Sequence, residues 1–254
     1  RAIELDPRFS VAYCNRATVF LAMGRHVEAL ADSDAALRIQ PNLLEAMVCR
    51  ARIFQALQCY SDAVAVARSI LQISPDHLTA WYAAMEALLA MVQANQASGV
   101  VDESLLREVE QVLGEVLRRR PDFFQALHNR AIIRQMLRRH DEALADLDRV
   151  LQSAPGFTQA HITRGNVLLE LMRHSEAVAA YDHALALQPA NADCLASKAN
   201  ALIGLLNTKA DGPLLNVVLL GEIEKTLLLS ALEKCQGVRK RAARLLGISF
   251  RSIR

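Results

Sequence analysis

The chain has 254 residues, of which 52% are hydrophobic and only 5% aromatic, and its formal net charge is +2. This length suits one or two domains, and no run of 18 or more apolar residues predicts a transmembrane helix. None of the five cysteines forms a CxxC pair. We therefore expect small buried thiols in a reducing cytoplasm rather than a zinc or redox site.

Prolines recur at a nearly fixed interval and divide the chain into units. They stand at 7, 41, 75, 121, 155 and 189, so that four of the five intervals are 34 residues and one is 46. A fixed period of this length is typical of stacked helical repeats. Residues 1–9 are the end of one helix pair, and because the chain starts within a helix we expect it to be part of a longer protein. Full units follow at 10–43 and 44–77.

The next unit, 78–123, contains twelve extra residues. We expect its segment QANQASGVVDES to lengthen the turn between two helices, and SLLREVEQVLGEVLRRR to form a long amphipathic second helix. Units 124–157 and 158–191 return to the 34-residue period, and a partial unit follows at 192–206. Within 124–157, two helical faces are predicted by the i, i+3, i+4 spacing of Leu127, Ala131, Ile132, Met136, Ala143, Leu144, Leu147, Val150 and Leu151.

Small residues recur in register with the prolines and predict positions where helix backbones approach closely. Overpacking such a position typically costs about 1–3 kcal/mol. His26, His140 and His174 also recur in register, which predicts a packing or turn position rather than a metal site. The small residues are Ala17, Ala51, Ala131, Gly165 and Ala199 in the first helices, and Ala29, Ala63, Ala143 and Ala177 in the second.

Three segments resemble the tetratricopeptide repeat: NRATVFLAMGRHVEALADSDAALRIQP, HNRAIIRQMLRRHDEALADLDRVLQSAP and TRGNVLLELMRHSEAVAAYDHALALQP. The resemblance covers about residues 1–206 and implies an all-α, right-handed helical solenoid. In that family the concave face formed by the first helices binds extended peptides. The resemblance therefore implies a protein or peptide partner, held in a groove lined by Cys14, Asn15, Arg52, Tyr82, His128, Asn129, Asn166 and Asn200.

The repeat pattern stops at 207–213, where NTKADGP is a linker signal and the predicted domain boundary. A long helix is predicted at 214–235, followed by a glycine-containing turn, a short helix VRKRAARLL and a third helix that starts near Ser249. Helices joined in this way are typical of a helix-turn-helix. Six of the 29 basic residues and no acidic residue lie between 237 and 254, which leaves 23 basic against 27 acidic residues in the rest of the chain.

Residues 214–254 resemble the small Fis-type helix-turn-helix found at the C-terminus of bacterial enhancer-binding activators. The matching words are EIEKTLLLSALEK, AARLLGIS and FRSIR. The match ends at Arg254, about halfway along the family's recognition helix, so we expect tight binding from a chain extended past this residue. The resemblance implies duplex DNA as a partner, since basic side chains neutralise phosphates and the start of a recognition helix reaches base edges. The DNA-contacting residues would be Arg239, Lys240, Arg241, Ser249, Phe250, Arg251, Ser252 and Arg254.

The helix at 214–235 also carries an apolar stripe that two short neighbouring helices could not cover. Related modules dimerise through the equivalent helix, which suits two DNA half-sites about one helical turn apart. We therefore expect a homodimer through 214–235. The stripe consists of Leu215, Leu219, Ile223, Leu227 and Ala231.

Together these patterns predict a cytoplasmic, bacterial-type transcriptional regulator whose repeats bind a protein and whose C-terminal end binds DNA. We expect no enzyme activity and no cofactor, because the chain has no GxxxxGK[ST] phosphate loop, no GxSxG elbow and no HExxH zinc motif. Two alternatives stay open. One is a pure protein-interaction adaptor whose basic tail is only a helical cap, and the other is an accessory repeat region of a transferase.

Overall fold

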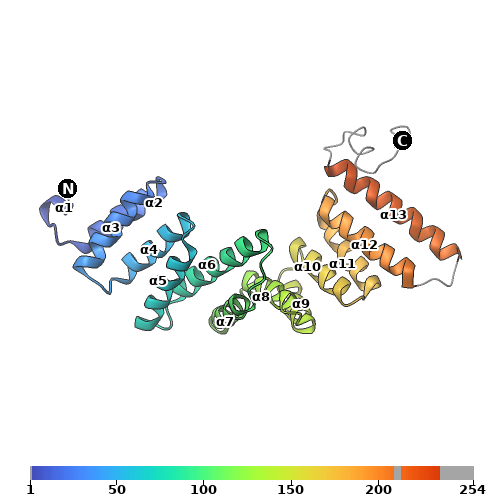
Figure 1. Cartoon of the computed structure of the whole chain (residues 1–254), viewed down its shortest axis with the longest axis horizontal. Helices are drawn as coiled ribbons and strands as arrows, with labels where there is room; N and C mark the ends of the chain where they lie inside the picture. The colour runs from blue at the N-terminus through green and yellow to red at the C-terminus, as the bar shows by residue number, and fades with distance from the viewer. Residues whose placement is uncertain (1, 209–212, 235–254) are drawn as a thin grey trace. The chain divides into compact units, whose positions relative to one another are not determined.

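The computed structural model describes residues 2–208 and 213–234, and every element in this part of the chain is a helix (Figure 1). A short helix, α1 (Ala2–Leu5), precedes six helix pairs. The first helices of the pairs are α2 (Ser10–Ala22), α4 (Leu44–Ala56), α6 (Leu78–Ala97), α8 (Phe124–Met136), α10 (Thr158–Glu170) and α12 (Ala192–Thr208). The second helices are α3 (His26–Ile39), α5 (Tyr60–Ile73), α7 (Glu103–Arg119), α9 (His140–Ser153), α11 (His174–Leu187) and α13 (Pro213–Lys234).

The helices pack into two compact units, Arg1–Ala126 and Leu127–Arg254. In the N-terminal unit, each helix from α2 to α7 contacts the next, and the first helices α2, α4 and α6 also contact one another in series. In the C-terminal unit, α9 to α13 contact in the same sequential way, and α10 contacts α12. Such nearest-neighbour packing is the organisation of a repeat array, so the predicted all-helical repeat fold is confirmed.

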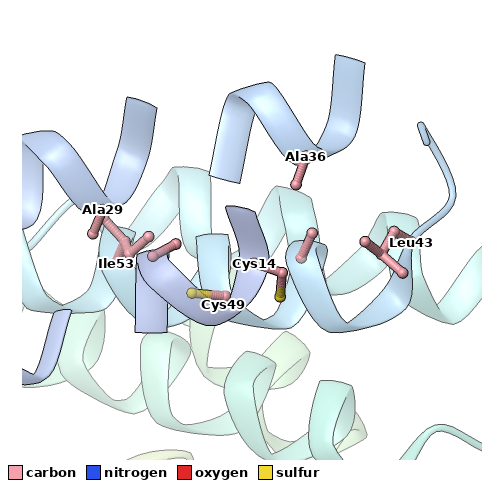
Figure 2. Close-up of a cluster of buried hydrophobic side chains, with 8 residues drawn as sticks. Cys14, Ala29, Ala36, Leu43, Cys49 and Ile53 are labelled. Carbon is pink, nitrogen blue, oxygen red and sulfur yellow. The ribbon is translucent and has the colours of Figure 1, made fainter. Parts of the chain in front are cut away.

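The small residues predicted to lie at helix contacts are buried. Ala29 of α3 and Ala36 of the same helix belong to one apolar cluster with Cys14, Cys49 and Ile53 of the flanking first helices (Figure 2). A larger side chain at these positions would push the helices apart, since helix axes can approach closely only over small residues. The register alanines with no exposed surface are Ala17, Ala29, Ala51, Ala63, Ala131, Ala143, Ala177 and Ala199.

Gly165 lies at one such close approach. A Cβ atom at this position would lie 2.5 Å from Cε1 of Tyr181, the ring of which is fully buried against α10. The large ring of α11 thus fills the space that the missing side chain of α10 leaves open. The backbone of Gly165 lies within a regular helix, which any residue could adopt. Packing against Tyr181, and not backbone conformation, therefore requires glycine here.

The turn between the two helices of a pair uses a left-handed backbone conformation at one repeated place. Gly24, Gln58, Arg138 and Met172 have φ values of 73°, 60°, 61° and 58°. Only glycine adopts this conformation without a steric penalty, which for other residues is roughly 1–2 kcal/mol. Three of these four turns therefore hold strain that glycine would remove.

Met172 offers a direct test of that strain, because its side chain is exposed. We expect Met172→Gly to raise the free energy of unfolding by about 0.5–1 kcal/mol, the steric relief being partly offset by the greater freedom of glycine in the unfolded chain. The control is Met172→Ala, which also removes the side chain but keeps the strained conformation. Urea unfolding followed by circular dichroism measures both. A Met172→Gly midpoint no higher than that of Met172→Ala would contradict the interpretation.

The twelve extra residues of unit 78–123 do not lie mainly in the turn, as expected. Most of them extend helices: α6 has 20 residues and α7 has 17, whereas α4 has 13 and α5 has 14. The segment QANQA, expected in the turn, belongs to α6, because alanine and glutamine are good helix formers and the first helix breaker is Gly99. The carboxylate of Asp102 then caps α7 by accepting from the backbone N–H groups of Ser104 and Leu105.

The predicted domain boundary at 207–213 lies between two helices of the structure and stays a prediction. Helix α12 continues to Thr208 and α13 already begins at Pro213, with only 209–212 outside the described residues between them. Helix α13 packs against α12 within the C-terminal unit, in the way α11 packs against α10. The last repeat is therefore completed by a second helix. The predicted shorter helices after 235 lie outside the described residues.

Three of the cysteines are buried thiols, as predicted: Cys14, Cys49 and Cys194. Burial raises the pKa of Cys194 to about 11, which keeps it protonated and unreactive. Cys59 departs from the prediction because it is exposed, at the start of α5. Cys235 lies outside the described residues.

Arginine–carboxylate pairs tie the helices together at repeated positions. Within one pair of helices, Arg16 Nε lies 2.6 Å from Asp32 Oδ2 and Arg130 Nη2 lies 2.6 Å from Asp146 Oδ1. Between neighbouring pairs, the equivalent cations contact the preceding second helix, in Arg50–Asp34, Arg164–Asp148 and Lys198–Asp182. The basic residue that recurs in every first helix except α6 therefore makes an interhelix contact.

The recurring histidines begin second helices, each directly after an arginine that pairs with a glutamate three residues on. Arg25–Glu28, Arg139–Glu142 and Arg173–Glu176 are such pairs. In each, the arginine hydrogen bond lowers the pKa of the glutamate, which lies in the first turn of its helix. A carboxylate there also faces the positive end of the helix dipole. His26, His140 and His174, predicted at a packing or turn position, are thus the first residues of second helices, and His174 is buried.

Candidate functional site

The predicted groove residues fall on the first helices, but the structure divides them by accessibility. Asn15, Arg52 and Asn200 are exposed, while Tyr82, Asn129 and Asn166 are half-buried. Cys14 and His128 are each only 6% exposed, so they present little surface to a ligand. Their burial follows from contacts between neighbouring first helices.

Cys14 lies where α2 meets α4. The Thr18 hydroxyl donates to the Cys14 carbonyl at 3.1 Å and lies 3.7 Å from the thiol of Cys49 on α4. Burial raises the pKa of both thiols. Cys14 therefore helps to join two repeats.

His128 makes the equivalent contact in the C-terminal unit. Its Nε2 lies 3.0 Å from Oγ1 of Thr163 on α10. Because the Thr163 hydroxyl already donates to the Gln159 carbonyl, the histidine must donate through Nε2–H. Burial lowers the pKa of His128, which keeps the imidazole neutral in this contact. Protonation at acidic pH would place a charge in a buried site. The contribution of His128 to the free energy of unfolding is therefore lost as the pH falls.

Asn166 and Asn200 occupy the same repeat position on two first helices that contact each other. They stand 34 residues apart, on α10 and α12. The Tyr181 hydroxyl donates to Oδ1 of Asn166 at 2.7 Å, which orients the amide so that its NH₂ group can donate to another acceptor. The sequence analysis did not identify Tyr181. Gly165, the one glycine among the small register residues, could have indicated that a large side chain of the second helix packs against it.

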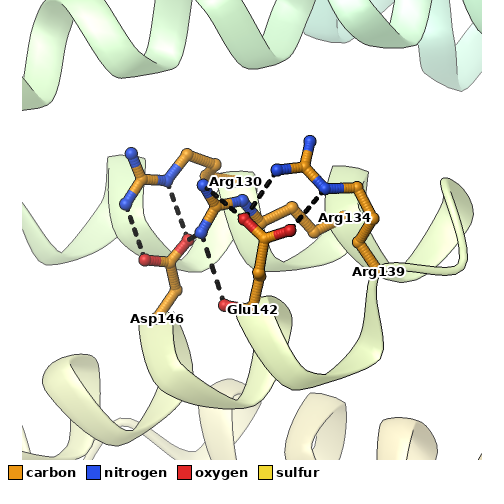
Figure 3. A network of polar contacts seen from close by, with 5 residues as sticks. All are labelled: Arg130, Arg134, Arg139, Glu142 and Asp146. Carbon is orange, nitrogen blue, oxygen red and sulfur yellow. Dashed lines mark hydrogen bonds and ion pairs between the residues drawn. The ribbon is translucent and has the colours of Figure 1, made fainter.

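A network of charged side chains holds the α8–α9 turn in place. Asp146 accepts from Arg130 and from Arg134 Nη1, and Glu142 accepts from Arg139 through both oxygens (Figure 3). A second carboxylate, Glu170 at the end of α10, accepts from Gln135 Nε2 and Arg138 Nη1. These charges are compensated within the protein, which suits a structural role more than ligand binding.

The N-terminal unit contains a cavity of about 650 Å³ that no sequence pattern predicted. It lies between α5, α6 and α7, with an Arg68–Glu108 ion pair at its rim. Trp81 is fixed in its wall by a 2.8 Å hydrogen bond to the Pro75 carbonyl. The remaining lining is largely apolar, so the cavity offers contact to an apolar group but no uncompensated charge to select one.

The predicted DNA-contacting residues, from Arg239 to Arg254, lie outside the described residues. The structure describes the helix that leads into them, α13, as far as Lys234. Among the described residues, no cluster of three or more metal-binding side chains is present. No helix in this part of the chain has both the length and the apolar character to cross a membrane.

Comparison with known protein families finds matches both for the repeats and for the C-terminal segment. Residues 1–31 and 158–191 match models described as tetratricopeptide repeat, and residues 219–254 match the model of the bacterial regulatory protein, Fis family. No curated protein matches the chain.

Solved structures have the same fold, and the first of the two that follow is described as a tetratricopeptide-repeat protein. One is YrrB, described as having an unusual peptide-binding site, with 18% identity, a TM-score of 0.67, and coverage of 78% of this chain and 95% of that one. Another is MamA (41-end) from Desulfovibrio magneticus RS-1, with 19% identity, a TM-score of 0.63, and coverage of 72% and 96%. The chain therefore has the fold of tetratricopeptide-repeat proteins, with two segments that match this repeat, and it ends in a segment that matches the Fis family of bacterial regulatory proteins.

Proposed function

We propose that the chain is a transcriptional regulator that binds duplex DNA through its C-terminal segment and a protein partner through its repeats. The observation that carries the proposal is the Fis-family match at 219–254, which contains six basic and no acidic residues after 236. Such a run neutralises phosphates and releases their counterions. A cytoplasmic location belongs to the same proposal, because that is where bacterial DNA lies.

The DNA-contacting side chains divide into two groups by their expected roles. Arg239, Lys240 and Arg241 would hold the phosphate backbone and set the orientation of the module. Ser249, Phe250, Arg251, Ser252 and Arg254 would stand at the start of the recognition helix, where base edges are reached.

The partner of the repeats is proposed to be an extended peptide. Support comes from Asn166 and Asn200, whose amides lie on adjacent first helices and can hydrogen-bond to a peptide backbone. The amide of Asn166 is already oriented by Tyr181, so less entropy is lost when it binds a ligand. Asn15, Arg52, Tyr82 and Asn129 would extend this surface along the other first helices.

We expect a chain extended past Arg254 to bind a randomised duplex in fluorescence anisotropy, with an affinity that falls steeply between about 50 and 200 mM salt, and the chain that ends at Arg254 to bind it weakly. Arg239→Ala and Arg241→Ala should weaken binding to all sequences and each reduce the salt slope by about 1. Ser252→Ala and Arg254→Ala should change sequence preference instead.

The matched control is Arg107→Ala, which removes one positive charge from an exposed position in α7. It should leave DNA affinity unchanged, because it lies within the acidic array. If the chain extended past Arg254 shows no salt-dependent DNA binding, or if Arg107→Ala weakens that binding as much as Arg239→Ala does, the DNA proposal fails. The chain would then be a protein-interaction adaptor.

The predicted homodimer through 214–235 would have to use a different face of this helix from the one expected. Ile223 and Ala231, two members of the apolar stripe, are buried and lie in the part of α13 that packs on α12. Leu229, which is 41% exposed, lies on the accessible side. The transferase alternative gains no support, because both matched families are interaction or regulatory families.

A further inference from the structure

Helix α13 belongs to two parts of the chain at once. Its residues from 219 onward open the Fis-family match, and the same residues pack against α12, the first helix of the last repeat. Ile223 lies in an apolar cluster with Leu202 of α12. The Fis-family segment and the array therefore share a helix.

Polar contacts set the position of α13 along α12. The Ser230 hydroxyl donates to the Ala192 carbonyl at 2.9 Å, and Lys234 Nζ lies 3.2 Å from Asp193 Oδ1. These bonds join the end of α13 to the start of α12, so the two helices are antiparallel. Thr226 and Ser230 are buried between them, small enough for close approach.

Lys198 connects three helices at the centre of this contact. Its ammonium lies 2.9 Å from Asp182 Oδ1 on α11 and 2.7 Å from Glu222 Oε1 on α13. Its side chain is only 11% exposed, whereas those of Asp182 and Glu222 are about half exposed. Burial alone would lower the pKa of Lys198, but the hydrogen bonds to Glu222 and Asp182 outweigh it and raise the pKa.

The earlier repeats show what is particular to this position. Arg164 and Arg50 make the corresponding contact to Asp148 and Asp34 on the preceding second helix. Lys198 makes that contact too, through Asp182, and adds a carboxylate from the Fis-family segment. A contact that stacks repeats elsewhere in the chain is here extended to the DNA-binding segment.

We propose that Lys198 is the positioning residue that fixes the Fis-type segment on the last repeat, so that DNA binding depends on the α12–α13 contact. Glu222 and Asp182 repel each other once the lysine is removed, and α13 loses its central bond to the array. The groove residue Asn200 lies on α12, two residues from Lys198. Its helix is therefore the one that connects the proposed peptide surface to the proposed DNA segment. The claim on DNA rests on the proposed function, whereas the claim on docking does not.

The test compares the full chain with Lys198→Met, Lys198→Arg and Glu222→Gln by amide hydrogen exchange followed by mass spectrometry. In Lys198→Met, amides of α13 should exchange about 5–30-fold faster, which corresponds to a loss of one or two kcal/mol, while those of α9 and α10 stay unchanged. Glu222→Gln should give a smaller increase in the same helix, and Lys198→Arg should restore protection. The control is Lys225→Met, which removes a neighbouring exposed lysine of α13 and should change nothing.

The second measurement is the affinity of the same variants for duplex DNA at low salt. Lys198→Met should weaken it about 5–30-fold, Lys198→Arg should retain it, and Arg107→Ala, outside the Fis-family segment, should serve as the equal-charge control. Unchanged α13 exchange in Lys198→Met would overturn the docking role. Faster exchange with undiminished DNA affinity would overturn the dependence of DNA binding on docking. If the unaltered chain, extended past Arg254, binds no DNA, the proposed function fails, and the exchange arm still decides the docking role alone.

Discussion

Replacing Asp146 with alanine is expected to lower the free energy of unfolding of the C-terminal unit by about 2–4 kcal/mol. Its carboxylate is only 4% exposed and accepts from Arg130 and Arg134, whose side chains are each 15% exposed. Without it, two largely buried guanidinium groups lose a common acceptor. The hydration that replaces it is poor in such a site, so the cost exceeds that of a surface pair.

The N-terminal unit provides a matched comparison for Asp146→Ala. Asp32 accepts a pair of bonds from Arg16 in the same geometry, at 2.6 and 2.7 Å, but the Arg16 side chain is 48% exposed. Asp32→Ala should therefore cost only about 1 kcal/mol, since water can solvate the released arginine. Denaturant unfolding and local hydrogen exchange measure both variants. Equal losses would show that burial of the arginines does not set the value of these pairs.

Gly165→Ala should destabilise the C-terminal unit by about 2 kcal/mol, although alanine is a better helix former than glycine. The new Cβ would meet the buried ring of Tyr181 at 2.5 Å, and overpacking of this kind costs about 1–3 kcal/mol. Displacement of the ring also breaks the hydrogen bond from Tyr181 to Asn166, worth about 1 kcal/mol. Together these losses exceed the gain of roughly 1 kcal/mol in helix propensity.

Two further variants isolate the ring contact. Gly114→Ala places the same methyl group inside α7, where nothing lies within 4 Å of it, so it should stabilise the N-terminal unit by up to about 1 kcal/mol. In a Tyr181→Leu background, Gly165→Ala should become nearly neutral, because the clashing ring is absent. Thermal or urea unfolding of the four single and double variants gives the coupling energy. A Gly165→Ala variant as stable as the unaltered chain would refute the close contact.

Helix positions and the core were open to prediction because both depend on local periodicity. A 34-residue spacing of prolines and small residues places each helix end and each buried alanine, such as Ala17 and Ala143, without reference to distant contacts. The same spacing predicts one packing or turn position for the recurring histidines, each of which begins a second helix. Predictions were weaker wherever a residue's neighbour comes from another repeat, as for Cys14 and His128, whose burial depends on Cys49 and Thr163 of the next unit.

The sequence by itself determined the helical repeat, its register and the basic, Fis-like character of the C-terminal end, because each is written in residue spacing and composition. The tertiary structure decided which surfaces remain open. The first part of the segment expected as a long turn belongs to α6, because no helix breaker precedes Gly99. Helix α13 packs against α12. That docking depends on Lys198 meeting carboxylates 16 residues before it and 24 residues after it. Whether an amphipathic helix covers its own array or a partner is a competition between distant contacts, which the periodicity of one helix does not record.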